Sequence, residues 1–231
     1  MRDQVKTIFF DLDHTIWDFE KNSSEALQDL IRIHGLESVI GNTLQFIADY
    51  KKINHLYWEA YRKGEMEKAE LRIGRFREAL SAYGVEDPAM HEKFADGYVE
   101  LSPEKTNLFP HAHEVLEYLA AKYPMYIITN GFEEIQGRKM RNTKINTFFK
   151  GVITSEMAGV RKPHPDIFKY AMGISNAMPH HSVMIGDEPD IDIRGAGEMG
   201  LFTILFNPVQ KEHQVKANHE IHSLIQLKEL L

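Results

Sequence analysis

Two aspartates follow directly on an apolar run near the start of the chain. Ile8, Phe9 and Phe10 are good strand formers, and their run predicts a strand buried on both faces. Asp11 and Asp13 come next, and in extended chain side chains two residues apart point the same way. Like charges this close destabilise each other unless a cation or a shared proton intervenes. At the carboxyl end of a buried strand, where open α/β sheets bind ligands, the pair predicts a functional site rather than a plain polar turn.

Two later segments offer the means to bind an anion. Thr129-Asn130-Gly131 follows a second apolar run and provides a hydroxyl and backbone N–H groups at a helix start. Lys162 precedes Pro163, which favours extended backbone at the lysine and presents a compact positive charge.

A third group of acids follows a later strand. Gly186-Asp187 ends that strand, and Asp190 and Asp192 come soon after. Clustered carboxylates are ligands suited to a hard cation, which predicts Mg²⁺. An anion cradle, a cation and a nucleophilic carboxylate together indicate phosphoryl transfer.

Alternating strand and helix patterns must position these residues. The expected strands are residues 8–10, 125–128, 151–154, 183–185 and 202–205. Helices are expected over 110–122, after Gly131 to about 142, over 165–173, and at the end of the chain over 223–231. This rhythm predicts an α/β fold with a Rossmann-like parallel sheet. The carboxyl ends of parallel strands share one edge, which would bring the acids, Thr129 and Lys162 together.

The first two strands are separated by far more chain than a parallel crossover needs. Residues 24–34, 43–63, 69–83 and 87–101 carry helical apolar stripes, with no strand pattern among them. We therefore expect residues 17–106 to be an inserted α-helical bundle and residues 1–16 and 107–231 to form the catalytic core. Inserted directly after the aspartate pair, the bundle is expected to act as a lid on the substrate.

Composition limits the partners. The net charge of −7 argues against a nucleic-acid polymer, whose phosphates need a basic face. The chain has no cysteine, and no apolar run approaches membrane-spanning length. The apolar region of Met1–Phe10 is too short for a signal peptide. These features favour a cytoplasmic protein acting on a small phosphorylated metabolite, and they leave the oligomeric state open.

Taken in order, these motifs resemble the haloacid dehalogenase (HAD) superfamily, in its phosphatase branch with a helical C1-type cap. The family pattern Asp-x-Asp-x-Thr matches Asp11 to Thr15, and the later motifs match Thr129, Lys162, and Gly186-Asp187 with an acid at Asp192. The resemblance covers the whole chain. Pro189 and the additional acid Asp190 depart from the pattern, so either Asp190 or Asp192 could face the metal.

The resemblance implies a role for each residue. Asp11 would attack phosphorus and become an aspartyl phosphate, while Asp13 would serve as general acid and then base. Asp11, the Asp13 carbonyl, Asp187 and Asp192 would hold Mg²⁺. The phosphoryl oxygens would be bound by Thr129, the Asn130–Gly131 backbone and Lys162.

The segments Asp11–Phe19 and Ile128–Phe132 are most similar to bacterial pyrimidine 5′-nucleotidases. Nucleoside 5′-monophosphates are therefore the expected substrates, with Trp17 and Phe19 at the substrate entrance and specificity set by the insertion, which carries Arg62, Lys63, Arg72 and Arg75. The alternative is a sugar-phosphate phosphatase or a phosphoglucomutase-like phosphotransferase of the same fold.

Other functions fit less well. A dehalogenase would have no use for Asp13, and a non-catalytic phosphate-binding protein would be expected to have lost one of the motif residues. Residues 195–200 match the dinucleotide fingerprint G-x-G-x-x-G, but they precede a strand instead of following one. The pairs His111/His113 and His180/His181 lack the companion ligands of a zinc site.

Overall fold

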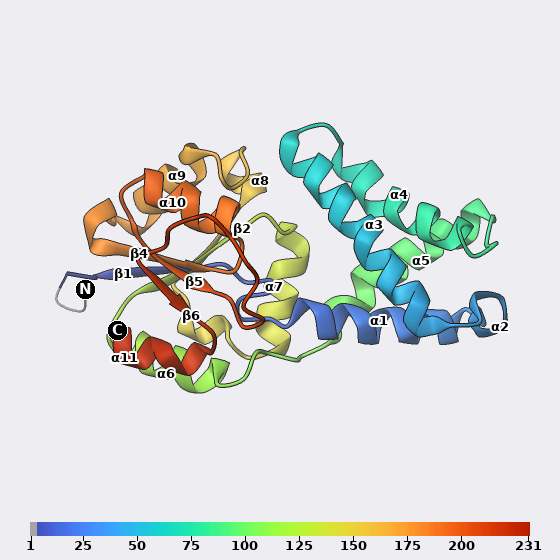
Figure 1. The fold of residues 1–231 in the computed structure, drawn as a ribbon, viewed down its shortest axis with the longest axis horizontal. Helices are drawn as coiled ribbons and strands as arrows, with labels where there is room; N and C mark the ends of the chain where they lie inside the picture. Colours follow the sequence, from blue (N-terminus) through green and yellow to red (C-terminus); the bar gives the residue numbers. More distant parts are fainter. Residues whose placement is uncertain (1–3) are drawn as a thin grey trace. The chain divides into compact units, whose positions relative to one another are not determined.

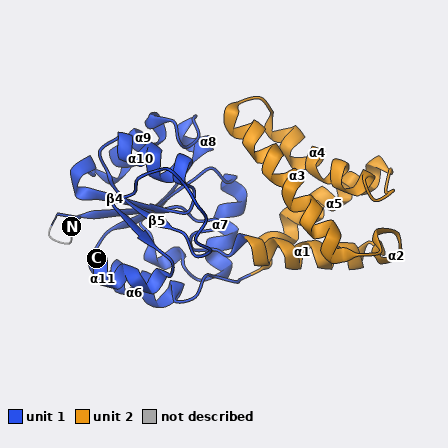
Figure 2. Ribbon diagram, viewed as in Figure 1, with its two compact units in different colours: residues 1–19, 106–231 blue, residues 20–105 orange. Residues whose placement is uncertain are grey.

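The computed structural model describes residues 4–231, so the first three residues of the segment considered for a signal peptide lie outside it. The described chain forms two compact units, residues 4–19 with 106–231 and residues 20–105 (Figure 2). Trp17 and Phe19, which the sequence prediction places in the helical insertion, pack instead with the core of the first unit. Among residues 4–231, no helix is long and apolar enough to cross a bilayer.

The first unit is an α/β structure around a six-stranded parallel sheet with the order β3-β2-β1-β4-β5-β6 (Figure 1). The fold class predicted from the sequence is therefore confirmed. The strands are β1 (Thr7–Phe10), β2 (Met125–Thr129), β3 (Gly151–Thr154), β4 (Ser182–Gly186), β5 (Phe202–Phe206) and β6 (His219–Ile221).

Alternation along β1 divides the core of this unit between the two faces of the sheet. Ile8 and Phe10 point into one apolar cluster with helices α6 (Ala112–Ala120) and α7 (Glu133–Asn142). Phe9, on the opposite face, packs in a second cluster with α9 (Pro165–Ser175) and α10 (Arg194–Glu198). Side chains on both faces are buried, which explains why β1 is apolar at every position after Thr7.

Short helical elements complete the first unit. They are α8 (Ser155–Ala158), α11 (Leu227–Leu230), the 3₁₀ turns η2 (Asn146–Phe148), η3 (Pro179–His181) and η5 (Leu224–Gln226), and the π-helical turn η4 (Pro189–Ile193).

Near its carboxyl end the chain departs from the sequence prediction. No strand was expected between residues 205 and 223, but residues 219–221 form β6, which pairs in parallel with β5. Ile221 alone in this strand is buried, so no apolar pattern marks it. The expected terminal helix over 223–231 is instead the turn η5, which begins with a capping box of Ser223 and Gln226, followed by the short α11.

The second unit is all α-helical. Its elements are α1 (Phe19–Ile33), which starts at the end of the first unit, α2 (Glu37–Ile40), α3 (Thr43–Lys63), α4 (Lys68–Ser81), α5 (Pro88–Leu101) and the 3₁₀ turn η1 (Ser102–Glu104). Leu27, Phe46, Phe76 and Phe94 are fully buried in its apolar core.

Capping residues explain where these helices begin and end. The Asn42 side chain accepts a hydrogen bond from Gln45 N at the start of α3, and Gly64 ends that helix with a φ of 75°. At the start of α5 the Asp87 side chain accepts a hydrogen bond from Ala89 N. Helix α1, in contrast, begins five residues before the predicted Ser24, because Ser24 Oγ donates to Glu20 O within the helix and does not cap it.

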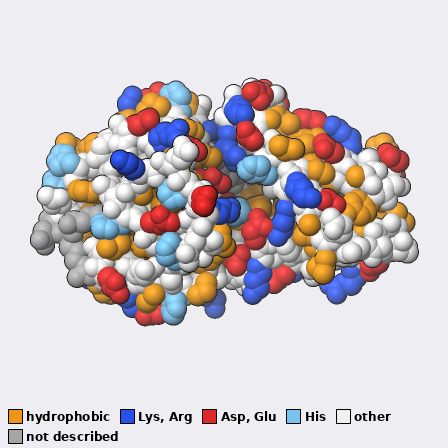
Figure 3. Space-filling view, in the orientation of Figure 1, with side chains coloured by type: hydrophobic (Ala, Val, Ile, Leu, Met, Phe, Trp, Pro, Cys, Tyr) orange, Lys and Arg blue, Asp and Glu red, His pale blue; other side chains and the backbone are white. Residues whose placement is uncertain are grey.

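Charge of both signs covers the visible surface. On the face shown in Figure 3, Lys and Arg side chains are interspersed with Asp and Glu over both units.

Candidate active site

The predicted site residues of the first unit lie at one edge of its sheet. Phe10 of β1 pairs with Ile127 of β2 on one side and with Ile185 of β4 on the other. The chain positions that follow these three strands are therefore neighbours. Asp11 leaves β1, Thr129 ends β2 and Asp187 leaves β4.

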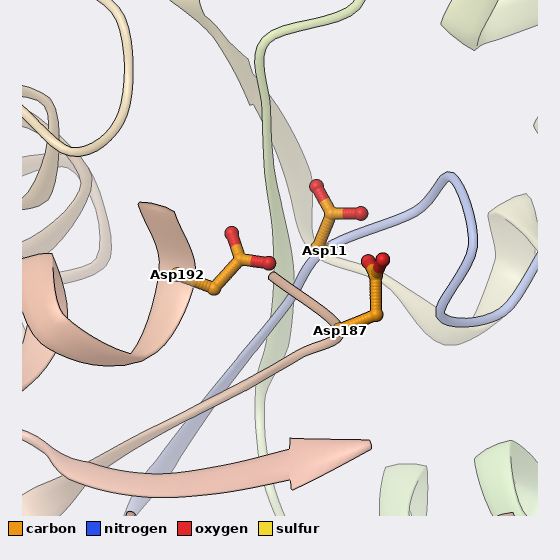
Figure 4. A group of neighbouring side chains, drawn as sticks. All are labelled: Asp11, Asp187 and Asp192. Carbon is orange, nitrogen blue, oxygen red and sulfur yellow. The ribbon is translucent and has the colours of Figure 1, made fainter. Parts of the chain in front are cut away.

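Three carboxylates meet at this edge. Ligand oxygens of Asp11, Asp187 and Asp192 all lie within 4.8 Å of one another, and Figure 4 shows the three side chains directed toward a common volume. Asp11 and Asp192 are buried, 7% and 1% exposed. A compact, oxygen-only donor set of this kind fits a hard divalent cation such as Mg²⁺.

The crowding is visible in the proton affinities of the acids. Burial raises the pKa of Asp11 to about 7 against the opposing charge of Lys162, and Asp192 adds to the increase. Burial, together with the charges of Asp11 and Asp192, raises the pKa of Asp187 well above its ordinary value. A bound cation would relieve this repulsion and favour the ionised carboxylates.

Lys162 lies at the centre of the buried acids and is 2% exposed. Its Nζ is 2.6 Å from Asp11 Oδ1, 2.7 Å from Asp192 Oδ1 and 2.7 Å from the carbonyl oxygen of Ile128. Burial alone would lower the pKa of Lys162, but Asp11 and Asp192 raise it above its ordinary value. All three donors of the ammonium group are thus engaged, and the positive charge is fixed beside Asp11.

The structure distinguishes the two acids of the fourth motif. Asp192 Oδ2 accepts a hydrogen bond from Glu188 N at 3.1 Å, which fixes the carboxylate within the cluster. Asp190 is exposed, and its Oδ1 lies 2.5 Å from Arg194 Nη2 in an ion pair. Gly186 makes room for this arrangement, because a Cβ there would lie 2.3 Å from Asp192 Oδ2.

The predicted anion-binding segment, Thr129-Asn130-Gly131, has fewer free hydrogen-bond donors than expected. The Gly131 N–H donates to Thr129 Oγ1 at 3.0 Å. The Asn130 side chain pairs with the Lys162 backbone in both directions, accepting from its N–H at 2.8 Å and donating to its carbonyl at 3.0 Å. Asn130 therefore ties the end of β2 to the loop that carries Lys162.

Two residues that the sequence prediction passed over surround Asp13. Lys139 Nζ lies 2.6 Å from Asp13 Oδ1, and Gln136 Nε2 donates to Asp13 Oδ2 at 2.8 Å. Burial alone would raise the pKa of Asp13, but these contacts, chiefly Lys139, bring it below the ordinary value. The available sequence signal was weak: Met140 is the one apolar residue among the buried positions of α7.

Thr15, the last residue of the first motif, connects it to the fourth. Its hydroxyl donates to Asp187 Oδ1 at 3.1 Å, and its side chain is fully buried. The hydrogen bond orients one of the clustered carboxylates.

The expected role of Trp17 does not agree with the structure. Its side chain is 0% exposed and belongs to the core of the first unit, with Lys139 Nζ 4.1 Å from the ring centroid. A buried indole covered by an ammonium group has no free face for a nucleobase, so we assign no substrate contact to Trp17. Phe19 is half-buried and stacks on His14 at a centroid distance of 4.6 Å.

Comparison with known proteins identifies relatives along the whole chain. YfnB of Bacillus subtilis, whose name describes it as a HAD-hydrolase, is 32% identical over 232 residues, 99% of this chain and 96% of YfnB. A crystal structure of YfnB bound to magnesium matches with a TM-score of 0.89 at 30% identity, covering 98% of both chains.

Two other relatives have names that state a reaction. Pyrimidine 5′-nucleotidase YjjG of Escherichia coli is 29% identical over 227 residues, 97% of this chain and 96% of YjjG. Glyceraldehyde 3-phosphate phosphatase of Pyrococcus furiosus is 30% identical over 244 residues, 99% of this chain and 93% of the relative.

The family itself is established by a direct match. The family model described as haloacid dehalogenase-like hydrolase matches residues 5–200, which include all four motifs. The resemblance drawn from the motifs is thereby confirmed. This chain belongs to the haloacid dehalogenase-like hydrolase family.

Proposed function

We propose that the protein is a Mg²⁺-dependent phosphomonoesterase that acts through an aspartyl phosphate on Asp11. The observation that carries this proposal is the buried cluster of Asp11, Asp187 and Asp192 with Lys162 between two of the acids. A nucleophilic carboxylate beside a fixed positive charge suits attack on a phosphate monoester, whose negative charge would otherwise repel the nucleophile.

The metal would be held by the clustered acids. Asp11, Asp187 and Asp192, together with the backbone carbonyl of Asp13, are the ligands that we assign to Mg²⁺. When bound, Mg²⁺ would neutralise the carboxylates and the phosphoryl oxygens. The relative YfnB, 30% identical in its solved structure, contains magnesium.

The two aspartates of the first motif would divide the chemistry. An oxygen of Asp11 attacks phosphorus, the bond from phosphorus to the leaving oxygen breaks, and that oxygen takes a proton from the Asp13 carboxyl group. Asp13 then accepts a proton from the water that attacks the aspartyl phosphate, and the bond between phosphorus and Asp11 breaks to release phosphate. Each proton transfer to or from a positioned carboxyl is worth a factor of roughly 10²–10⁴.

The phosphoryl group would be held by the ends of β2 and the loop after α8. Thr129 Oγ1 accepts two hydrogen bonds, from Gly131 N and from Gln136 Nε2, which leaves its proton free to donate to an anion. Lys162, whose Nζ is 2.6 Å from Asp11 Oδ1, contributes positive charge. These groups bind any phosphate monoester and do not select the alcohol.

We assign nucleoside 5′-monophosphates, pyrimidine ones first, as the substrates. Support comes from the similarity to YjjG and from the motif segments described above. Triose phosphates are the second candidate, because the glyceraldehyde 3-phosphate phosphatase relative is as similar as YjjG, 30% against 29%.

The test is a turnover panel of nucleoside monophosphates, triose phosphates and hexose phosphates, measured with Mg²⁺ and with excess EDTA. The expected result is turnover that disappears with EDTA, returns with Mg²⁺ and has its highest kcat/KM on UMP or dUMP. If glyceraldehyde 3-phosphate has the highest kcat/KM, the proposed substrate class changes to triose phosphates and the proposed chemistry stands. Full turnover in EDTA, or none on any phosphomonoester, would overturn the proposal.

A further inference from the structure

Helix α7 buries two polar side chains next to the general acid–base. Gln136 is 0% exposed and Lys139 is 4% exposed, and they lie three residues apart on one face of the helix. An apolar residue at either position would pack in the core without a desolvation cost. Gln136 Oε1 even lacks a hydrogen-bond partner among the described residues, which is unfavourable for a buried polar atom.

We propose that Lys139 and Gln136 are positioning residues for the Asp13 carboxyl group, a proposal that rests on the phosphatase function given above. Each oxygen of Asp13 has its own donor, Lys139 Nζ for Oδ1 at 2.6 Å and Gln136 Nε2 for Oδ2 at 2.8 Å. With both oxygens held, the carboxyl plane is fixed. A carboxylate has about four acceptor sites, so two remain for proton transfer.

The ammonium group of Lys139 is itself held from the other side. It lies 4.1 Å from the ring centroid of Trp17 and 5.7 Å from that of Phe19. Cation–π attraction of this kind is strongest when the cation is desolvated, as it is here. Trp17 thus supports the cation that holds Asp13.

Gln136 couples Asp13 to the phosphate-binding hydroxyl. Its Nε2 also donates to Thr129 Oγ1 at 2.7 Å, so one amide group connects the acid–base to Thr129. Gly131 leaves space for this amide, because a Cβ at that position would lie 2.2 Å from Gln136 Nε2. Gln136 therefore explains why a glycine occupies position 131.

The experiment compares aryl phosphates whose leaving groups differ in their need for a proton. The variants are Lys139→Met and Gln136→Leu, with Arg141→Met as the matched control, since Arg141 is an exposed cation on the same helix. The measured quantity is kcat/KM, which reports the steps up to loss of the alcohol. Thermal unfolding shows whether each variant is folded.

For phenyl phosphate, whose phenolate is a poor leaving group, we expect Lys139→Met to lower kcat/KM by about 10–100-fold, a part of the factor available from general acid catalysis. Loss of Lys139 also removes the contact that lowers the pKa of Asp13, which by itself favours the proton-donating form, so the decrease reports lost positioning and not lost protonation. For 2,4-dinitrophenyl phosphate, which leaves without a proton, the loss should be under about threefold. Gln136→Leu should show the same pattern, Lys139→Arg should restore part of the phenyl phosphate rate, and Arg141→Met should match the wild type.

A second measurement places the effect at Asp13. In an Asp13→Asn background, Lys139→Met should change kcat/KM for phenyl phosphate by less than about twofold, because the group that it positions is already lost.

Equal losses for both aryl phosphates, or a full additional loss in the Asp13→Asn background, would overturn the positioning role and leave the phosphatase function intact. Absence of any aryl or alkyl phosphatase activity in the wild type would instead contradict the proposed function. If Lys139→Met does not fold, Gln136→Leu and Lys139→Arg decide the question by the same comparison.

Discussion

Lys162 and Asp192 form an ion pair with a distance of 2.7 Å between Nζ and Oδ1, and both side chains are only 2% exposed. The pair joins the loop that precedes α9 to the turn η4 after β4. It also shares the Lys162 charge with Asp11. Breaking a buried pair of this kind leaves an uncompensated charge, so loss of the Asp192 carboxylate should destabilise the protein.

Asp192→Asn should destabilise the protein and weaken metal binding, because it removes one of the two carboxylates that compensate Lys162. We expect a loss of about 1.5–3 kcal/mol in the free energy of unfolding and a Mg²⁺ affinity lower by about 10–100-fold. Urea denaturation and calorimetric titration measure the two effects. Asp190→Asn is the control, since Asp190 is exposed, and it should stay within about 0.5 kcal/mol of the wild type. Equal effects of the two substitutions would contradict the assignment of Asp192.

Gly186→Ala should displace Asp192, because the added Cβ would lie 2.3 Å from Asp192 Oδ2 and 2.5 Å from its Cγ. The expected results are a loss of about 1–3 kcal/mol in stability and a lower Mg²⁺ affinity. Gly173→Ala, in helix α9, has no atom within 4 Å of the added Cβ and should stabilise the helix by about 0.5–1 kcal/mol. Thermal unfolding of both variants gives the comparison, and an unchanged Gly186→Ala protein would show that Asp192 can move freely.

Stabilisation by Mg²⁺ should increase with pH. In the metal-free protein burial raises the pKa of Asp11 to about 7, whereas the unfolded value is near 3.8. Between these values the folded state binds a proton that the unfolded chain has released, so the free energy of unfolding falls as pH rises. A bound cation replaces that proton, and the increase in Tm on adding Mg²⁺ should be larger near pH 8 than near pH 5.5. For Asp11→Asn, the increase in Tm on adding Mg²⁺ should differ less between pH 8 and pH 5.5. If the increase in the wild type does not depend on pH, the proposed metal site is wrong.

Asp11→Ala should form no covalent intermediate. Mass spectrometry after a rapid acid quench during turnover should detect phosphorylated wild type and only unmodified Asp11→Ala. Asp13→Ala should remain folded and lose a factor of roughly 10²–10⁴ in turnover of phosphate esters with poor leaving groups. Near-normal activity of Asp11→Ala would show that another group is the nucleophile.

Trp17→Ala and Phe19→Ala should differ in kind. Trp17 is a fully buried core side chain, so its loss should destabilise the protein by about 3–5 kcal/mol through a cavity. Phe19 is half-buried, and its removal should change stability less. If Phe19 contacts a nucleobase, Phe19→Ala will raise KM for UMP more than for glyceraldehyde 3-phosphate, which a steady-state comparison on the purified variants measures. Equal changes in KM would remove Phe19 from the proposed substrate contacts.

Residues at strand ends were predictable from the sequence because a simple rule applies to them. A parallel sheet brings the carboxyl ends of its strands to one edge, so Asp11, Thr129 and Asp187 could be grouped without a structure. Lys162 lies in the loop after α8 and Asp192 in the turn η4, both beyond those ends, and they were proposed from the following Pro163 and from the run of acids after Gly186. Which of Asp190 and Asp192 turns inward depends on the π-helical turn η4, for which the sequence has no marker.

Side chains that contradict the usual patterns were missed. Gln136 and Lys139 are polar helix residues, and polar helix residues are ordinarily expected on the solvent side. Trp17 was expected near a substrate because aromatic residues bind bases, but its place in the core depends on contacts with distant segments, such as its pairing with Leu108. Strand β6 was missed because one buried isoleucine produces no alternation.

The order of strands in the sheet has a consequence for how the protein folds during synthesis. Strand β1 is made first, yet its neighbours β2 and β4 end at Thr129 and Gly186. At the roughly 5–20 residues per second of translation, the apolar segment Thr7–Phe10 waits for about 10–35 seconds until its second partner exists. Such unpaired apolar strands promote aggregation. The helices between residues 20 and 105, whose contacts are closer in sequence, can fold during that interval, whereas the sheet edge that carries the candidate active site forms only after β4 has been translated.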